Sequence, residues 1–210
     1  MKLYMVPLAP NPTKVMLYIA ERLEQGVDLG VEQIIVNTVK GHHKTPEHIE
    51  RNPFGTLPVL QLEDKSYLIE SLTIMLYLEA CFPHSALLPK EPKLRALALE
   101  IERIVDLRAA VYIGQFAHAT RSPLGRPPDP AAASNAATSL QPAFDYLETM
   151  LSDNRQFLTG KKPSLADFTL QASCQFLRFI EADLFGERHR LRSWDERFRE
   201  TPAGRSVLKW

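Results

Sequence analysis

The sequence predicts a two-domain protein, with a mixed α/β domain over residues 1–83 followed by an all-helical domain over residues 92–210. Three observations lead to this prediction. Short β-branched and apolar runs alternate with helical patterns in the first 81 residues. Pro83, Pro89 and Pro92 then interrupt the chain, so residues 84–91 are expected to form a linker. Beyond the linker, apolar residues recur at helical spacing and no segment has the pattern of a strand.

The first domain is expected to begin with a strand, a helix and a second strand. Residues 2–6 have a strand pattern, and Asn11 followed by Pro12 is typical of the N-cap and first position of a helix. That helix should end near Gly26. Residues 31–36 are rich in β-branched side chains and predict the second strand. This order implies parallel pairing of the two strands with a right-handed crossover.

The stretch from Asn52 to Leu60, NPFGTLPVL, is the most informative part of the chain. Its Pro53 and Gly55 predict a turn, and Pro58 is expected to open a strand. Proline holds the residue before it extended, so the backbone N–H and C=O of Leu57 would be free to pair with a peptide-like ligand. A cis bond between Leu57 and Pro58 would suit this arrangement.

A second strand over residues 66–69 should lead into another helix. The pair Glu70-Ser71 precedes apolar residues at helical spacing, and Ser71 is a favourable N-cap. The free N–H groups in the first turn of such a helix attract a carboxylate.

The second domain is expected to contain several helices and no sheet. Ser164 and Asp167 predict a capping box before an apolar helix that would form the buried centre of the domain. Pro142 is expected to kink or break the helix that contains it. The helical patterns cover residues 94–119, 131–151, 168–180 and 197–205.

Composition narrows the function classes. Lys and Arg number 25 and Asp and Glu number 25, so no global charge attracts nucleic acid or an anionic membrane. No apolar run is long enough to span a membrane. The two cysteines, Cys81 and Cys174, lie in apolar helical patterns and are expected to be buried free thiols, which fits a reducing, cytoplasmic location. The histidines at 42, 43 and 48 have no cysteine nearby, so no metal site is expected.

Three motifs in this order and spacing resemble the cytosolic glutathione transferase family: NPFGTLPVL, the Glu-Ser pair that opens a helix, and PSLADFTL. The resemblance covers essentially the whole chain. It implies a thioredoxin-like domain that binds glutathione and an all-α domain that contributes the pocket for the acceptor substrate. It also implies a homodimer, with the turn around Phe54 in the dimer contact, and glutathione as cosubstrate without a metal.

The resemblance also implies roles for individual residues in glutathione binding. Leu57 beside Pro58 would pair with the cysteinyl amide, Ser71 and its helix start would bind the γ-glutamyl carboxylate, and Glu70 would accept from the amine. His43 and Lys44 would supply cations for the glycyl carboxylate. Plainer interpretations compete with these roles: a strand start for Leu57, a helix cap for Glu70 and Ser71, and a solvated loop for His43 and Lys44.

Thiol activation is the less certain half of the chemistry. Enzymes of this type place Tyr, Ser or Cys just after the first strand, but the loop here contains Ala9 about where a serine would stand. Asn11 is the best remaining candidate, because its amide can donate to a thiolate although it cannot act as a base. The pattern Ala9-Pro10-Asn11 is similar to that of bacterial and fungal glutathione transferase-like proteins with Asn at this point, some of which reduce disulfides with glutathione. Alternatively, Asn11 is only a helix cap.

The predicted function is a glutathione-dependent transferase that stabilises the thiolate for attack on an electrophile or for glutathione-linked disulfide reduction. Arg108, Tyr112 and Gln115 lie about one helical turn apart and are candidates for the acceptor pocket, with a plain mixture of core and surface as the alternative. One competing function is a glutathione-dependent isomerase or dehalogenase. The other is a non-catalytic glutathione-binding or partner-binding module, which the absence of a hydroxyl at Ala9 favours.

Overall fold

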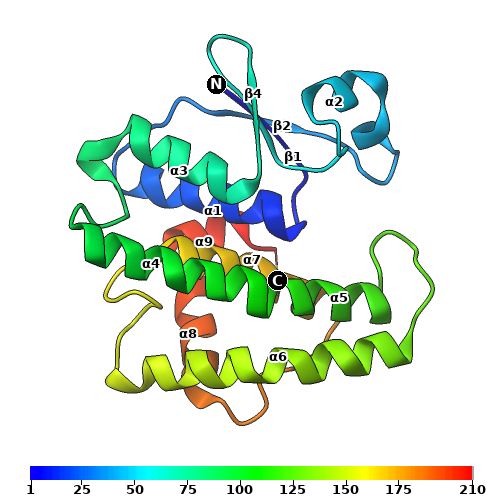
Figure 1. Ribbon diagram of the computed structural model, residues 1–210, viewed down its shortest axis with the longest axis vertical. Coiled ribbons are helices and arrows are strands. Elements are labelled where there is room, and N and C mark those ends of the chain that lie inside the picture. The colour runs from blue at the N-terminus through cyan, green and yellow to red at the C-terminus, as the bar shows by residue number, and fades with distance from the viewer. Residues whose placement is uncertain (210) are drawn as a thin grey trace.

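The computed structural model describes residues 1–209, and Figure 1 shows a small sheet with its helices above a group of longer helices. The elements of the first part follow one another in the predicted order. They are β1 (Lys2–Met5), α1 (Pro10–Glu24), β2 (Glu32–Ile35), the 3-10 helix η1 (His42–Lys44), α2 (Pro46–Arg51), β3 (Val59–Gln61), β4 (Tyr67–Ile69) and α3 (Ser71–Cys81).

The sheet has the strand order β2-β1-β3-β4. Strand β1 is parallel to β2, with Tyr4 opposite Ile34, and antiparallel to β3, with Tyr4 opposite Val59. The β1–α1–β2 unit therefore has the parallel pairing that the sequence predicts. This mixed four-stranded sheet, followed by helices alone within the described residues, confirms a thioredoxin-like domain joined to an all-α region.

The second part of the chain is helical. Its elements are the 3-10 helix η2 (Pro83–Ser85), α4 (Pro92–Ile104), the π-helix η3 (Val105–Ala110), α5 (Val111–Thr120), α6 (Pro130–Met150), the 3-10 helix η4 (Leu151–Asp153), α7 (Leu165–Phe179), α8 (His189–Arg199) and α9 (Pro202–Val207). Helices α4, η3 and α5 follow one another without a break, and α6 continues through Pro142. The kink predicted at Pro142 has not ended the helix.

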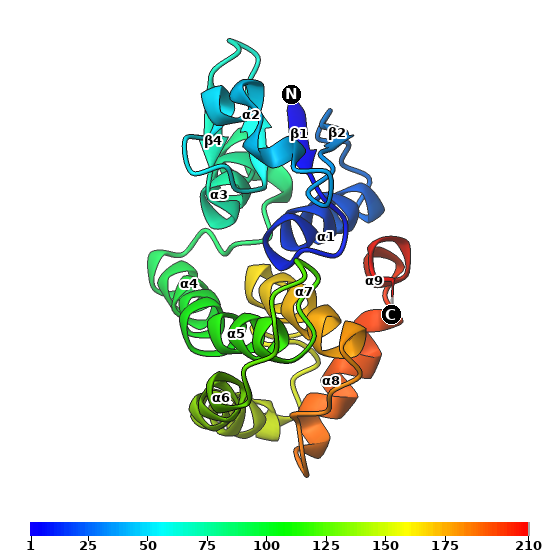
Figure 2. The ribbon, with the colours of Figure 1, turned by 90° about the vertical axis from the view of Figure 1, so that its right-hand side faces the viewer.

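Helix α7 forms the centre of the helical part and joins it to the sheet domain. Its residues from Leu165 to Leu177 are buried, and the predicted capping box between Ser164 and Asp167 is present. Helix α1 packs against both α7 and α9. Figure 2 shows α7 directly below α1, with α4 and α5 on one side and α8 on the other. The start of α1 therefore lies between the two parts of the chain.

Two helix starts differ from the prediction. Helix α1 begins at Pro10 with Ala9 as its N-cap, so Asn11 lies inside the first turn. Proline at the first helical position has a suitable φ and needs no hydrogen-bond partner, which allows this earlier start. Helix α3 has Glu70 as its N-cap, and Ser71 is its first residue. Ser71 therefore offers both its hydroxyl and its N–H at the helix start.

The prediction was also wrong at the C-terminal end and at one cysteine. Residues 189–207 form two helices rather than one short helix, and α8 buries Trp194 and Phe198 despite its many charged residues. Cys174 is buried as expected, and burial raises the pKa of its thiol. Cys81 is exposed, because it ends α3 on the side that faces away from the core. Across residues 1–209, no helix combines the length and the apolar character needed to span a membrane.

Candidate functional site

Strands β1 and β4 end, and strand β3 begins, at the same end of the sheet. In the β3–β4 pair Val59 lies opposite Ile69, and in the β1–β3 pair Val59 lies opposite Tyr4. Leu57, Ser71 and Val6 each lie two residues beyond these paired positions, where the chain leaves the sheet at the same end. The starts of α1 and α3 and the turn before β3 therefore lie at this end of the sheet. The predicted glutathione site needs these three segments to be close together.

The bond between Leu57 and Pro58 is cis, as the sequence analysis favoured. Leu57 precedes the first paired residue of β3, and its backbone N–H and C=O form no hydrogen bond with any other described residue. Pro58 behind it is buried. The Leu57 backbone therefore remains available to hydrogen-bond with an extended ligand at this end of the sheet.

The turn before Leu57 is held by two buried side chains that the sequence analysis did not identify. Asn52 donates from Nδ2 to the Thr56 carbonyl at 3.0 Å and accepts from the Phe54 N–H at 3.0 Å. His48 Nε2 lies 3.1 Å from the same Thr56 carbonyl. Because both bonds end on the residue before Leu57, they fix the direction in which the Leu57 backbone points. His48 is thus part of the support for this turn.

Glu70 and Ser71 stand at the start of α3. Glu70 is exposed, has a φ of 69°, and makes no capping bond with its side chain. A positive φ is uncommon for a residue other than glycine and is often found at functional sites. Ser71 is 5% exposed, and the first bonded N–H of the helix belongs to Ile74, which donates to the Glu70 carbonyl. The N–H groups of the preceding turn are therefore free to bind an anion.

His43 and Lys44 lie in η1 beside the same turn. Lys44 Nζ donates to the carbonyl oxygens of Phe54 at 3.4 Å and Gly55 at 3.3 Å. Gly55 has a φ of 59°, and a Cβ there would lie 3.0 Å from the His43 carbonyl oxygen, so this position favours glycine. Desolvation, followed by the nearby Lys44 and His48, lowers the pKa of His43. Lys44 is therefore the cation of this pair at neutral pH.

Asn11 is exposed in the first turn of α1, and its side chain makes no hydrogen bond within the described residues. Pro10 and Pro12 on either side of it have no N–H, and the Thr13 N–H donates to the Ala9 carbonyl at 3.0 Å. The first turn therefore offers few backbone donors, namely the N–H of Ala9 and the N–H of Asn11, beside the Asn11 amide and the buried Thr13 hydroxyl, which has no partner within the described residues. The alternative role of Asn11 as a helix cap is wrong, since Ala9 is the N-cap.

The loop between β1 and α1 is joined to the helical part of the protein. Leu8 has a φ of 78°, and its carbonyl accepts a hydrogen bond from Gln175 Nε2 of α7 at 3.5 Å. Gln175 is fully buried, and its Oε1 accepts from the N–H of Lys209. No short-range pattern marks Gln175 as a neighbour of Leu8, because 167 residues separate them.

The acceptor candidates lie in η3 and α5, which continue the long helix that begins with α4. Arg108 is exposed in η3, Gln115 is exposed in α5, and Tyr112 is half-buried against the core. A groove of about 760 Å³ lies elsewhere, between α4, the end of α6 and residues 161–163, and contains none of the predicted site residues. Among residues 1–209, no group of three or more His, Cys, Asp or Glu side chains is placed to hold a metal ion.

Comparison with known proteins agrees with this arrangement. Residues 1–80 match the family model described as the glutathione S-transferase N-terminal domain, and residues 130–201 match the glutathione S-transferase C-terminal domain. Glutathione S-transferase 3 of Zea mays is 31% identical over 80% of this chain and 73% of its own length. The chain belongs to the glutathione S-transferase family.

Two further proteins are similar to this member of the family. The crystal structure of Gtt2 from Saccharomyces cerevisiae superimposes with a TM-score of 0.86 at 25% identity, over 99% of this chain and 100% of Gtt2. The probable maleylacetoacetate isomerase 1 of Drosophila melanogaster is 32% identical over 71% of this chain and 58% of its own length. Family membership supports a glutathione-dependent transferase activity, with glutathione as a substrate.

Proposed function

We propose that this protein binds glutathione at the end of the sheet where Leu57, Glu70 and Ser71 lie, and stabilises the glutathione thiolate for reaction with a second substrate. The observation that carries the proposal is the unpaired Leu57 backbone, held beside the free N-terminal turn of α3. In a member of this family, an unpaired backbone segment next to an anion-binding helix start matches a small peptide with a terminal carboxylate.

Each part of glutathione has a partner of suitable chemistry. The Leu57 N–H and C=O pair with the cysteinyl residue, and Ser71 with the α3 N-terminus binds the γ-glutamyl carboxylate. The exposed Glu70 carboxylate accepts from the γ-glutamyl amine. Lys44 pairs with the glycyl carboxylate, while His43 contributes a neutral hydrogen-bonding group because its pKa is lowered.

Asn11 is the proposed thiolate-stabilising residue. Its amide and its N–H both donate at the start of α1, and neither removes a proton, so the thiol proton passes to solvent. The thiolate sulfur then bonds to an electrophilic carbon, whose leaving group departs with its electron pair. In disulfide reduction, the thiolate instead attacks a disulfide sulfur, forms a mixed disulfide and releases the other thiolate. A second glutathione thiolate resolves the mixed disulfide.

Arg108, Tyr112 and Gln115 are the proposed residues of the acceptor pocket. They lie on η3 and α5, and Arg108 forms no ion pair with any described residue. An unpaired arginine suits an acceptor that carries a carboxylate. A second candidate function, isomerisation of a maleyl-type diacid, follows from this cation and from the similarity to the probable maleylacetoacetate isomerase. Glutathione-dependent cis–trans isomerisation of such a diacid, without net loss of glutathione, would identify the isomerase.

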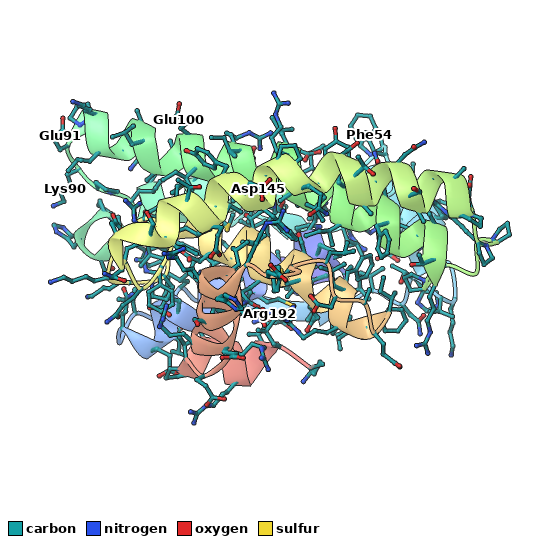
Figure 3. All side chains as sticks on the ribbon, turned by 90° about the horizontal axis from the view of Figure 1, so that it is seen from below. Phe54, Lys90, Glu91, Glu100, Asp145 and Arg192 are labelled. Atoms are coloured by element: carbon teal, nitrogen blue, oxygen red, sulfur yellow. The ribbon has the colours of Figure 1, made fainter. Side chains whose placement is uncertain are left out.

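A homodimer is the proposed assembly. Phe54 is 67% exposed at the turn before β3, and α4 to α5 expose further apolar side chains. Figure 3 shows Phe54 on the same side of the molecule as Glu100 of α4. Light scattering after size-exclusion chromatography should give twice the chain mass, and Phe54→Ser should lower it. Val39→Ser, at a residue 87% exposed on another loop, should leave the mass unchanged.

The test of the proposed function is a pH titration of the thiolate ultraviolet absorbance of glutathione bound to the wild-type protein, with saturation checked by calorimetry. A thiol pKa well below the free value of about 8.5 would support an enzyme that activates glutathione. Binding with an unshifted pKa would remove thiolate stabilisation and favour a non-catalytic binding module. Absence of binding would overturn the proposal.

A further inference from the structure

A buried group of charges joins α1 to the long helix of the second part of the chain. Lys14 Nζ lies 3.0 Å from Asp106 Oδ1 and 3.9 Å from Glu102 Oε1. Arg103 NH1 lies 2.9 Å from Asp106 Oδ2 and 3.7 Å from Glu102 Oε2. Thr169 of α7 donates to Glu102 Oε1 at 2.9 Å. The cluster therefore contains two cations and two carboxyl groups, contributed by α1, α4 and η3.

Lys14 lies close to the turn that holds Asn11. Asn11 and Lys14 are three positions apart on α1, which is a rise of about 4.5 Å along the helix axis. Side chains of a helix point toward its N-terminus, so the Lys14 side chain covers the first turn rather than the following one. Only 3% of the Lys14 side chain is exposed, so water and salt screen its charge weakly.

The two carboxyl groups of the cluster are shared between Lys14 and Arg103. Asp106 divides its two oxygens between Lys14 and Arg103. Glu102 is fully buried, and its Oε2 has no hydrogen-bond partner within the described residues. Desolvation raises the pKa of the Glu102 carboxyl, against the opposite effect of Lys14. A carboxyl that resists ionisation leaves more of the positive potential of Lys14 at the first turn of α1.

We propose that Lys14 and Asp106 set the electrostatic potential at the start of α1 with opposite signs, and thereby determine how readily bound glutathione loses its thiol proton. This inference rests on the proposed function. Lys14 acts at a distance and does not touch the ligand, so it is a positioning charge rather than a catalytic residue. Such a charge compensates for the few donors that Pro10 and Pro12 leave in the first turn.

A purely structural role for the cluster predicts something different. If the ion pair only held the two parts of the chain together, removing either partner would lower stability and leave the bound thiol pKa unchanged. An electrostatic role predicts opposite shifts for the two partners. Lys14→Met should raise the thiol pKa of bound glutathione, and Asp106→Asn should lower it. Each shift should be about 0.6 to 1.2 pKa units, as expected for one charge about 10 to 20 Å away at an effective dielectric constant of about 20.

The experiment is the ultraviolet titration of bound glutathione in wild type, both single variants and the double variant Lys14→Met/Asp106→Asn. The double variant should return close to the wild-type pKa, because one charge of each sign is removed. Glu148→Gln is the matched control. Its carboxylate pairs with Arg190 and is 18% exposed, against 24% for Asp106, and it should leave the thiol pKa unchanged.

The outcomes separate this inference from the proposed function. If Lys14→Met fails to fold, the downward shift in Asp106→Asn still decides the matter, since that residue is partly exposed. Glutathione binding with the same thiol pKa in wild type and Asp106→Asn, or shifts of the same sign in both single variants, would overturn this inference alone. Wild-type protein that does not bind glutathione would overturn the proposed function and this inference together.

Discussion

Val59 lies opposite Ile69 in the antiparallel β3–β4 pair, so Leu57, two residues before Val59, and Ser71, two residues after Ile69, leave the sheet at the same end. Leu57 has an unpaired backbone, and Ser71 begins a helix whose first-turn N–H groups have no partner within residues 1–209. A peptide strand and a carboxylate can therefore be bound side by side.

The first prediction concerns Ser71. Ser71→Ala removes a donor to the γ-glutamyl carboxylate, and a hydrogen bond to a charged group contributes about 1.5–3 kcal/mol, or roughly 10- to 150-fold in affinity. Glu70→Ala should also weaken binding through loss of its amine contact. Isothermal calorimetry with glutathione measures both effects. Ser66→Ala, in the exposed β3–β4 turn, is the control. Unchanged affinity in both site variants would show that Glu70 and Ser71 are not part of the glutathione site.

Lys44 and His43 should differ in their dependence on salt and pH. A histidine with a lowered pKa stays neutral until the pH falls below its ordinary value of about 6.5, so His43 carries little charge between pH 7 and 8. Lys44→Met should reduce glutathione affinity and weaken its salt dependence, whereas His43→Gln should leave the salt dependence unchanged over that range. Calorimetry at low and high salt tests this. A loss of salt dependence in His43→Gln would show a charged histidine instead.

The parts of the fold that the sequence predicted have local causes. The turn at Pro53 and Gly55, the extended Leu57 and the capping box of Ser164 and Asp167 each depend on residues a few positions apart. Proline, glycine and capping residues restrict the backbone where they stand, so one sequence contains the necessary information. The position of the candidate site at one end of the sheet could therefore be predicted from these local signals.

The parts that were missed depend on distant partners. The contact between Gln175 and Leu8 spans 167 residues, and the pair of Lys14 and Asp106 spans 92. Neither follows from periodicity, because a charged or polar residue on an amphipathic helix is normally assigned to solvent. The start of helix α8 was missed for a similar reason: its arginines conceal the spacing of its buried aromatic residues, and two of them, Arg190 and Arg192, pair with carboxylates on other segments.

Asn11→Ala should raise the thiol pKa of bound glutathione. The variant loses the side-chain amide donor but keeps the backbone N–H of residue 11, so the change in thiol pKa measures the effect of the side chain alone. The ultraviolet titration used for the wild type gives this value directly. Thermal unfolding should be little changed, because Asn11 is exposed and bonds to no other described residue. A pKa equal to that of wild type would assign thiolate stabilisation to backbone donors.

Pro12→Ala should have the opposite effect. The substitution adds an N–H to the first turn of α1, where Pro10 and Pro12 leave few donors. An added donor near a thiolate lowers its pKa, by the same reasoning that makes helix N-termini favourable for cysteine thiolates. Loss of a proline costs about 0.4–1 kcal/mol of stability through the unfolded chain. An unchanged or raised thiol pKa would indicate that the thiol does not lie at the start of α1.

Asp167→Ala should destabilise the fold without altering the candidate site. Asp167 is fully buried and accepts bonds from the Ser164 N–H and hydroxyl, the Leu158 N–H and Trp194 Nε1. Its loss leaves several buried donors without an acceptor, at a cost of about 3–5 kcal/mol, or roughly 10 °C in melting temperature. Asp153→Ala is the control. Hydrogen bonds from Arg155 hold the pKa of the Asp153 carboxyl at about 2, but because this carboxyl is exposed, its removal should matter little for folding. Calorimetry compares the two variants, and glutathione affinity of folded Asp167→Ala at low temperature should match wild type. Equal melting temperatures would mean that the capping box is not a stability element in this protein.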